Sequence, residues 1–494
     1  MGFDLDFDQR RALGYQLIDL LNDYYASLPT RAVQPPPVGS PPDAAPRPLP
    51  ERGGDPALIM KDLAVALIDQ GFHTPSANYF GLQNPTPTYM SVLAEALAAA
   101  LNPQLASLVH SRAAADIERE TVHWIGARVG WPGAFDGTFT SGGSEANFTA
   151  LALALATHFP DCVEQGVAAL DARPVLYTSA EAHHSVDKAT SLLGLGRQAL
   201  RRIPVTPAIQ MDAALLEARI LADRAQGFTP FCIIATAGTT SSGAVDDIAG
   251  LADVARRFGL WFHVDGAYGG ALVLSDRHRD LIKGIEHADS ITMDPHKWLA
   301  TSMSAGMVLT SHPDALRKVF ATINPFMPKA RDYQRIDNFD LGLQWSRRMN
   351  SLKLWLTLRT HGREAYEELI DRQISLARRF AQWLEGSGAF ELAAPQMLPG
   401  VIYRVRLPGA SEDAVRAANE AVVARVNAGG ERWISTAIVN GRSVIRTLVI
   451  SYLSQTRHLE DLQSALLEAT AEIGNGAVRD KVSLSAESPA AMIT

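Results

Sequence analysis

Residues 289–300 read DSITMDPHKWLA and place a short apolar strand just before a lysine that has small and apolar neighbours. Burying a charged lysine is costly, so burial lowers the pKa of a lysine amine and makes that amine a nucleophile. Lys297 is therefore either an unusual structural residue or the centre of a reaction. A reaction at a strand end also needs polar groups at the neighbouring strand ends, because an open α/β sheet builds its ligand sites there.

Helical stretches and short β-rich runs alternate around this lysine, from about residue 90 to residue 310. The β-rich runs are GTFTS (137–141), PVLYTS (174–179), PFCIIATAG (230–238), LWFHVDGAY (260–268), SITMD (290–294) and GMVLT (306–310). Strands separated by helices favour a mostly parallel sheet that helices cover on both faces. The sequence therefore predicts the α/β fold class for a large domain over 89–373.

The C-terminal part of the chain follows a different pattern. Its segments are a helix (374–386), GVIYRVRL (400–407), a helix (411–427), RWISTAIVNGRSVIRTLVIS (432–451) and a helix (457–473). This order predicts a small α/β or α+β domain with an antiparallel sheet over 374–474. Residues 475–494 are predicted to be a poorly ordered tail.

The N-terminal segment, 1–88, is predicted to be helical with an extended strap. Residues 8–27 carry apolar positions at helical spacing, and the proline-rich stretch VQPPPVGSPPDAAPRPLP (33–50) follows. Proline is excluded from helix interiors, so the strap must be extended. An amphipathic helix needs a surface to pack on. Packing on a second subunit and docking on its own chain satisfy that need equally well.

Composition and charge argue against a nucleic-acid-binding, a disulfide-rich or a membrane-spanning protein. The chain has 494 residues, 47% of them hydrophobic, and a formal net charge of -8, so it lacks the basic surface of a nucleic-acid-binding protein. Its 2 cysteines are too few for a disulfide framework and suit a reducing compartment. No apolar run is long enough to span a bilayer, and the N-terminus lacks a signal-peptide pattern. We therefore expect a cytoplasmic globular protein without membrane or nucleic-acid partners.

The stretch DGTFTSGGSEANFTALALALA (136–156) runs from a strand through a glycine-rich turn into a helix. Gly142 and Gly143 allow a sharp turn, and Ser144 stands where a helix N-cap would be. The free N–H groups and the positive end of the helix dipole make such a corner an anion site, well suited to phosphate. An ordinary strand–helix turn with a serine cap explains the same residues.

Three further strand ends carry polar groups. Asp265 follows an apolar run in WFHVDGAYGG (261–270) that we expect to be buried. Its carboxylate could bind a metal, a ribose or a protonated ring nitrogen. Alternatively, Asp265 is only the cap of the next helix. No second carboxylate or His/Cys cluster at metal spacing accompanies it, which disfavours a metal. His183, in AEAHHSVDKA, offers an imidazole that stacks on a ring or moves a proton, unless it is structural. Thr240, in ATAGTTSSGAVDDI, either offers a hydroxyl group to a ligand or is only part of a turn with a helix cap.

These signals are weak one by one and strong together, because all of them lie at strand-to-helix corners, on the edge where an open α/β sheet builds its site. A phosphate holder, a ring partner, an acid for a pyridine nitrogen and an amine for a Schiff base are the parts of a pyridoxal phosphate site. The sequence therefore predicts an enzyme that uses pyridoxal 5'-phosphate (PLP) and no metal.

The same motifs resemble those of the group II PLP-dependent decarboxylases, which include the aromatic L-amino-acid, tyrosine, histidine and glutamate decarboxylases. The resemblance covers about residues 8–470 and is most specific in AHHSVDKA, TAGTTSSGAVDDI, HVDGAYGG, DPHKW and RRMNSLKLW. It implies the fold type I PLP-dependent transferase fold, with a mostly parallel seven-stranded sheet in the large domain. It also implies a homodimer with shared active sites, in which the N-terminal segment is the swapped dimerisation segment.

The resemblance also implies roles for individual residues. Lys297 would form the Schiff base with the cofactor, and Asp265 would pair with its pyridine nitrogen. His183 would stack on the ring. Ala267 would contact the other face of the ring. The phosphate would be contacted by Gly143, Ser144 and His296.

Further residues are implied to act around the substrate. Thr240 and Asp246 would belong to the network around the ring and the substrate carboxylate. Tyr333, in KARDYQRIDNFDLG (329–342), would be the tyrosine of a mobile loop that closes over the partner subunit's site, where either this tyrosine or a histidine would protonate Cα. Two positions depart from the family pattern, because Asp294 replaces a common Asn and His184 replaces a common Ser. A carboxylate at position 294 would repel a phosphate unless it caps N–H groups or points away.

The segment HTPSANYFGLQNPTPTYM (73–90) aligns with the family's pocket-lining segment. Tyr79 and Phe80 would face an aromatic ring or belong to the core, and Gln83 and Asn84 would bind a polar tail. The segment contains no arginine or lysine to pair with a side-chain carboxylate. We therefore predict decarboxylation of an aromatic L-amino acid to its amine and carbon dioxide.

Three alternatives stay open. An aldehyde synthase on the same scaffold decarboxylates and deaminates oxidatively, although such enzymes commonly alter the residues retained here as Tyr333 and His183. A decarboxylase for an acidic or other non-aromatic amino acid would keep the same cofactor site. A catalytically silent protein would keep only the fold, which the retention of Lys297 and Asp265 disfavours.

Overall fold

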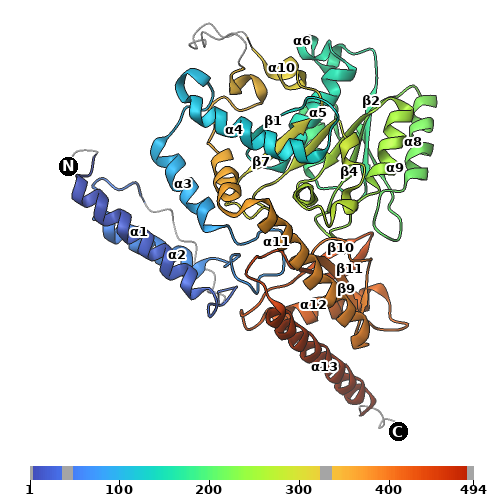
Figure 1. Ribbon diagram of the computed structural model, residues 1–494. Coiled ribbons are helices and arrows are strands. Elements are labelled where there is room, and N and C mark those ends of the chain that lie inside the picture. Colours follow the sequence, from blue (N-terminus) through green and yellow to red (C-terminus); the bar gives the residue numbers. More distant parts are fainter. Residues whose placement is uncertain (1–3, 36–47, 323–335, 487–494) are drawn as a thin grey trace.

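The computed structural model describes residues 4–35, 48–322 and 336–486, with side chains up to residue 472. A large α/β body forms the centre of the molecule, a small domain lies below it, and two N-terminal helices project from it (Figure 1). No helix of the described part is long and apolar enough to cross a membrane.

Within these residues, seven strands form the central sheet in the order β1-β7-β6-β5-β4-β2-β3. Strand β7 is antiparallel to β1 and β6, and the other neighbours are parallel. The expected mostly parallel sheet is therefore confirmed. The strands are β1 (Asp136–Thr140), β2 (Pro174–Ser179), β3 (Leu200–Ile203), β4 (Thr229–Thr236), β5 (Trp261–Asp265), β6 (Ser290–Met293) and β7 (Gly306–Thr310).

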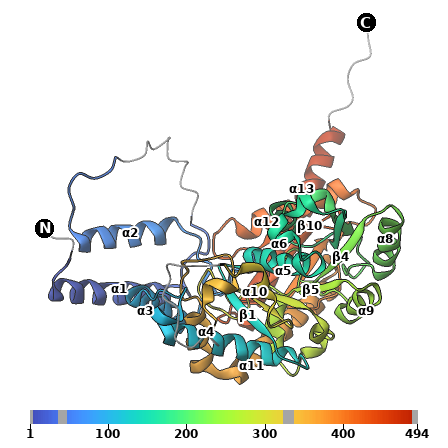
Figure 2. The same ribbon diagram turned by 90° about the horizontal axis from the view of Figure 1, so that it is seen from above.

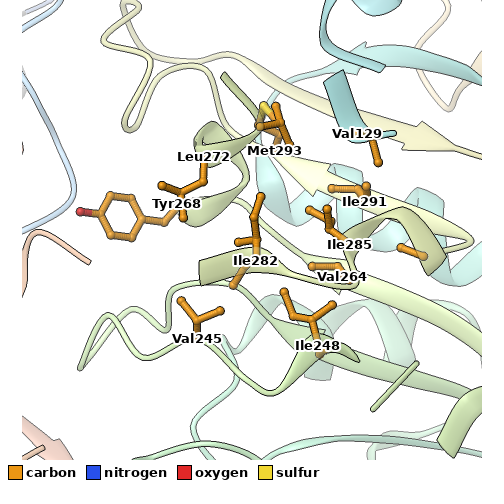
Figure 3. Packing of buried hydrophobic residues seen from close by; sticks show 14 of the residues in the cluster. Val129, Val245, Ile248, Val264, Tyr268, Leu272, Ile282, Ile285, Ile291 and Met293 are labelled. Atoms are coloured by element: carbon orange, nitrogen blue, oxygen red, sulfur yellow. The ribbon is translucent and has the colours of Figure 1, made fainter. Parts of the chain in front are cut away.

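Strand β4 shows why both faces of the sheet are covered. Ile233 and Ala235 pack in one hydrophobic cluster, whereas Cys232 and Ile234 pack in another. Successive side chains of a strand point to opposite faces, so a continuous apolar run is stable only between two layers. Figure 3 shows part of the first cluster, with Val264 of β5 among its members.

Strand β3 is an addition to the expected strands. Its sequence, LRRI, carries Arg201 and Arg202 in the middle. An edge position tolerates these charges, and among the described strands only β2 pairs with β3. The helices of this domain are α4 (Leu108–Val129), α5 (Gly143–His158), α6 (Cys162–Gln165), α7 (Ser185–Leu192), α8 (Ala213–Ala225), α9 (Ile248–Phe258) and α10 (Ala315–Phe320). Helix α5 lies against the sheet and α7, which explains its nearly uninterrupted apolar sequence.

The small domain contains a second sheet with the order β10-β11-β9-β8 in the described part, and all its neighbouring pairs are antiparallel, as expected. Its hairpin turns at Asn440 and Gly441, whose φ angles of 46° and 74° fit a type I′ turn. The elements are α11 (Ser351–Ser387), β8 (Phe390–Leu392), β9 (Gly400–Val405), α12 (Glu412–Asn427), β10 (Ser435–Val439), β11 (Arg442–Leu448) and α13 (Thr456–Ala486).

Helix α11 crosses the domain boundary predicted at residue 374. It bends at Gly362, where φ is 75°. Leu354, before the bend, and Ile370, after it, pack in the core of the large domain, whereas Phe380 and Leu384 pack in the cluster of the small domain. One helix therefore joins the large and small domains. The tail predicted from residue 475 is helical in its first part, because α13 extends to Ala486 and proline next occurs at position 489.

Three helices of the described chain precede α4: α1 (Phe7–Ser27), α2 (Pro56–Gln70) and α3 (Tyr89–Leu101), of which α3 lies within the range predicted for the large domain. Helix α1 begins with a capping box in which Asp6 and Gln9 satisfy each other's backbone N–H groups. Helices α1 and α2 lie side by side and project from the rest of the chain (Figures 1 and 2), to which α1 connects near its C-terminal end, where Tyr25 packs on Tyr89 of α3. No residue of these two helices is buried. Residues 36–47 of the proline strap between them lie outside the described residues.

Candidate active site

A cavity of about 360 Å³ lies at the ends of the central strands. Its walls come from the corner after β1, the loops after β2 and β4, and the ends of β5 and β6. These segments converge because the carboxyl ends of parallel strands meet at one edge of the sheet. The predicted site residues that line the cavity are Gly143, Ser144, His183, Thr240, Asp265, Ala267, His296 and Lys297.

Gly142 and Gly143 begin helix α5 at the cavity wall. Gly142 is the N-cap, and Ser144 lies in the first turn, which corrects the expected capping position of Ser144. A Cβ atom on Gly143 would lie 2.8 Å from Oδ2 of Asp294, so glycine permits this close approach. The first N–H groups of a helix have no partner within it, and together with the helix dipole they can hold an anion such as phosphate.

Asp265 ends β5 with both carboxylate oxygens held in place. Its Oδ2 accepts a hydrogen bond from Nδ2 of Asn147 at 2.8 Å, and its Oδ1 accepts one from the N–H of Ala267 at 3.2 Å. Nε2 of His263 lies 3.1 Å from Oδ1 of Asn147 and fixes the amide in turn. Burial lowers the pKa of His263 to about 4, with Asp265 acting in the opposite direction, so this histidine is neutral at pH 7. His263 therefore brings no positive charge to the side of Asp265 on which Asn147 lies.

His183 follows β2 and lines the cavity. Its Nδ1 lies 2.9 Å from Oγ of Ser185, and burial lowers the pKa of its imidazole, while Asp265 acts to raise it. A neutral imidazole suits stacking on an aromatic ring. The side chain of His184 is 88% exposed and lies 3.4 Å from Asp187, so this second histidine adds no proton-transfer group to the cavity.

Lys297 lies just after β6, in a turn with two other titratable side chains. Its Nζ lies 3.2 Å from Oδ2 of Asp294, and the two side chains are 21% and 3% exposed. Nε2 of His296 lies 3.9 Å from the same carboxylate oxygen, and its Nδ1 lies 2.6 Å from the carbonyl oxygen of Ala305. The predicted nucleophile is therefore partly open to the cavity and directly paired with an acid.

Thr240 connects the cavity to the small domain, because its carbonyl oxygen accepts a hydrogen bond from Nη1 of Arg446, in β11, at 2.8 Å. Asp246 does not line the cavity itself but bonds to Thr236, which does, so its expected place in the network around the substrate stays a prediction. Its oxygens accept hydrogen bonds from the N–H groups of Met211 at 2.6 Å and Thr236 at 2.8 Å. Burial raises the pKa of Asp246 to about 6. This acid therefore joins two loops.

The segment predicted to contact substrate belongs largely to the core. Phe80 is fully buried in the cluster of the small domain, which corrects its expected place facing a substrate ring. Tyr79 is 4% exposed and stacks on Trp433, with ring centroids 5.3 Å apart. Asn84 contacts the cavity wall indirectly, because its Nδ2 donates to Sδ of Met303, a cavity residue, at 3.3 Å.

Two more predicted residues do not line the described cavity. Gln83 is 8% exposed, and its Nε2 has no hydrogen-bond partner in the described part of the chain. Tyr333 lies outside the described residues, so its role stays a prediction.

Asn147 and Arg446 support the site and were not predicted from the sequence. Asn147 is a polar residue at the start of the apolar run NFTALALALA, and Arg446 interrupts the apolar run SVIRTLVIS. A buried polar side chain needs hydrogen-bond partners, so each interruption indicated a specific tertiary contact, although not which contact.

Comparison with known proteins identifies what the chain resembles. Residues 42–406 match the family model described as the pyridoxal-dependent decarboxylase conserved domain. The aromatic-L-amino-acid decarboxylase of Bacillus atrophaeus is 30% identical over 479 residues, which are 95% of this chain and 97% of that protein.

Two solved structures have the same overall fold. The crystal structure of Oryza sativa TDC with PLP and tryptamine is 28% identical, with a TM-score of 0.90 and coverage of 96% of this chain and 100% of that one. Rhodiola rosea 4-hydroxyphenylacetaldehyde synthase is 26% identical, with a TM-score of 0.83 and coverage of 95% and 99%.

Proposed function

Because the chain belongs to the family of pyridoxal-dependent decarboxylases, we propose that it converts an aromatic L-amino acid to the corresponding amine and carbon dioxide. It is a carboxy-lyase whose cofactor is PLP. The observation on which the proposed reaction depends is that Lys297, Asp265 and His183 meet in one cavity.

The residues of this cavity fit the cofactor. The start of α5 at Gly143 offers N–H groups to the phosphate, Asp265 offers a carboxylate to the ring nitrogen, and Lys297 offers an amine to the aldehyde. Thr236 lines the cavity, and its buried hydroxyl has no hydrogen-bond partner in the described part of the chain, as is expected for a group that a polar ligand would satisfy. When bound, PLP supplies the sink for the electrons of the bond that breaks at the substrate's Cα.

We assign the tasks of the reaction to individual side chains. Lys297 would hold the cofactor covalently through its amine. Asp265 would pair with the ring nitrogen and favour its protonated form, which attracts electrons. His183 covers one face of the ring and excludes water from it. Tyr333 or His183 delivers the proton to Cα.

Two observations support an aromatic substrate. The residues that line the cavity in the described part include no arginine, so a side-chain carboxylate would lack a guanidinium partner. The similar proteins include an aromatic-L-amino-acid decarboxylase and a structure that contains tryptamine.

The direct test incubates the PLP-loaded protein with each common L-amino acid and measures carbon dioxide, amine and hydrogen peroxide in the same samples. We expect equal amounts of carbon dioxide and amine from phenylalanine, tyrosine or tryptophan. Turnover of glutamate or aspartate alone would contradict the aromatic assignment, and aldehyde with peroxide would indicate an aldehyde synthase. Absence of carbon dioxide from every amino acid would refute the decarboxylase function.

Asp265→Asn is expected to lower kcat by about 10²–10³-fold, the scale on which one electrostatic partner acts in catalysis. An amide cannot balance the charge of a protonated ring nitrogen, although it leaves Lys297 free to bind the cofactor. Steady-state kinetics measure the loss, and Asp253→Asn, on an exposed aspartate of α9, is the matched control. A variant with kcat close to that of the wild type would contradict this role of Asp265.

We also infer that the enzyme is a homodimer with shared active sites. The helices α1 and α2 carry apolar side chains that the rest of the described chain leaves exposed: Phe7, Tyr15, Leu17, Ile18, Leu58, Ile59, Leu63, Val65 and Leu67. A pair of helices without further packing is unstable in water, and a second copy of the chain provides a symmetric surface to cover it.

The double substitution Ile59→Glu and Leu63→Glu is expected to halve the molecular mass in solution, because two carboxylates in an apolar interface lose their hydration. Sedimentation equilibrium measures the mass. Leu221→Glu is the control, since this exposed leucine lies on α8 in the large domain. A dimer that persists in the double variant would exclude these helices as the interface.

We place the enzyme in the cytoplasm. Cys162 and Cys232 are both free thiols. Free thiols suit a reducing compartment.

A further inference from the structure

A buried ammonium group holds one wall of the cavity without lining the cavity itself. Lys353 lies in the first turn of α11, and its side chain is 3% exposed. Its Nζ lies 2.5 Å from Oε1 of Glu95 and donates to the carbonyl oxygens of Ser302 at 3.3 Å and Ser304 at 2.9 Å. An ammonium group has three N–H donors, and these three acceptors use all of them. Lys353 therefore restrains the backbone on both sides of Met303.

Helix α3 holds the same segment. Oγ of Ser91 accepts a hydrogen bond from the N–H of Ser302 at 2.7 Å and lies 3.1 Å from the hydroxyl oxygen of Ser302. Ser91 and Glu95 are four residues apart on α3, so they lie on one face of this helix. Helix α3 also packs against α11. Two packed helices therefore hold residues 302–304 through Ser91, Glu95 and Lys353, which we call the clamp.

Residues 302–304 form part of the cavity wall. Met303 and Ser304 line the cavity, in a loop between β6 and β7. Met303 is 61% exposed, so burial contributes little to its position. Its Sδ accepts a hydrogen bond from Nδ2 of Asn84 at 3.3 Å. The place of the Met303 side chain therefore depends on the backbone that the clamp holds.

The position of Met303 suits a contact with the substrate side chain. The groups that suit the cofactor come from the start of α5, the loop after β2, the end of β5 and the turn after β6. A side chain that lines a cavity and is largely exposed lies where the cavity opens to solvent. A thioether there offers a polarizable surface, which makes favourable contacts with aromatic rings.

The charge of Lys353 gives the clamp its strength. Burial lowers the pKa of Lys353, while Glu95 acts to raise it and so favours the ammonium form. Arg348 pairs with the other oxygen of Glu95 at 2.5 Å and acts to lower the pKa of Lys353. Hydrogen bonds from a charged donor are stronger than those from a neutral one. Loss of the ammonium group would therefore release the backbone around Met303.

We propose that Lys353 is a positioning residue for substrate selection: its ammonium group, paired with Glu95, fixes residues 302–304 so that Met303 contacts the aromatic side chain of the substrate. This inference deepens the proposed function and rests on its assignment of an aromatic substrate. Lys353 contacts neither the substrate nor the cofactor and acts through Met303. Its effect is on which side chain binds, whereas the reaction at Cα depends on other residues.

Lys353→Met tests the proposal, because methionine is of similar length and cannot donate a hydrogen bond. Two amines probe the wall without any decarboxylation: phenethylamine carries an aromatic ring, and ethylamine lacks one. Titration of the PLP-loaded protein gives both dissociation constants from the absorbance of the bound cofactor. The variant is expected to bind phenethylamine about 10-fold more weakly, near the upper end of a thioether–ring contact, and ethylamine within about twofold of the wild type.

Equal weakening of the two amines in Lys353→Met, or no weakening of either, would overturn the proposal. Equal binding of the two amines by the wild type would overturn it as well. Lys318→Met, on the exposed face of α10, is the matched control and should leave both dissociation constants unchanged.

Met303→Ala provides the background that shows whether Lys353 acts through Met303. Residues that act through one contact have non-additive effects. In Met303→Ala the further change Lys353→Met should therefore alter phenethylamine binding by less than about twofold. Another 10-fold loss in this background would overturn the proposal in favour of a general structural role.

Ser91→Ala tests the clamp from α3 without removing a charge. It removes the acceptor of the Ser302 N–H, and the preference for phenethylamine is expected to fall about 3-fold, the scale of one hydrogen bond. If Lys353→Met does not fold, an unchanged preference in Ser91→Ala overturns the proposal.

Steady-state kinetics separate this inference from the proposed function. Lys353→Met is expected to raise KM for the aromatic amino acid about 10-fold and to leave kcat within about twofold, because it removes binding that ground state and transition state share. Carbon dioxide release by the wild type combined with an unchanged amine preference in Lys353→Met would overturn the role of Lys353 alone. The expected amine preferences without carbon dioxide from any amino acid would overturn the decarboxylation and support the role of Lys353 in selecting an aromatic ligand.

Discussion

Lys297→Ala is expected to lower kcat by at least about 10³-fold, because removal of the covalent nucleophile disables a group of residues that act as a unit. Its Nζ is paired with Asp294 at 3.2 Å and its side chain is 21% exposed, so it is the lysine of the cavity that a ligand can reach. Steady-state kinetics measure the loss of activity. Borohydride reduction followed by peptide mass spectrometry measures the loss of covalent PLP.

Another buried lysine shows why burial alone does not create such a nucleophile. Nζ of Lys353 pairs with Glu95 and donates to the carbonyl oxygen of Ser304 at 2.9 Å, and this lysine does not line the cavity. The matched control for Lys297→Ala is Lys318→Ala, because Lys318 is exposed on α10. Labelling that persists in Lys297→Ala would show that a different lysine carries the cofactor.

Glu118→Ala is expected to lower the free energy of unfolding by about 3–5 kcal/mol, because it leaves a buried arginine without its counter-ion. Glu118 and Arg347 form an ion pair in which the side chains are 3% and 4% exposed. Nη1 of Arg347 also donates to Oγ1 of Thr138 at 2.8 Å and to the carbonyl oxygen of Phe139 at 2.9 Å. The pair joins α4, β1 and the segment before α11. Urea denaturation measures the effect.

Two controls show whether the isolated charge is the cause. The double substitution Glu118→Leu and Arg347→Met should recover much of the loss, because apolar replacement of a whole buried ion pair is often neutral or stabilising. Asp253→Ala breaks the exposed pair with Arg256 and should cost less than about 1 kcal/mol. A loss in Glu118→Ala no larger than in Asp253→Ala would mean that solvent reaches the charge of Arg347.

Much of the sheet and the central part of the site follow from local patterns. Asp265 and Lys297 each come directly after an apolar run, and both runs are strands. Parallel strand ends meet at one edge, so their convergence was predictable without knowledge of any contact. Strand β3 escaped prediction because its LRRI sequence lacks an apolar run, and its edge position requires none.

The residues whose surroundings the sequence left open lie in loops, where the direction of a side chain does not follow from sequence spacing. Phe80 was a candidate substrate contact, but its backbone N–H donates to the carbonyl oxygen of Trp433 at 2.8 Å and its ring packs in the small domain. His184 stands beside a cavity residue and nevertheless points to solvent. Both outcomes depend on neighbours that are distant in the chain or on the local path of a loop.

The sequence by itself determined the layers of the fold and the chemistry available at its strand ends. It did so because apolar periodicity and residue type are local properties, and because parallel strands bring their carboxyl ends to a common edge. Only the tertiary structure decided which acids act there: Asp265 and Asp294 line the cavity, whereas Asp246 joins two loops. The physical reason is that a buried carboxyl group is placed by the hydrogen-bond donors and charges that surround it, and these come from segments far apart in the chain.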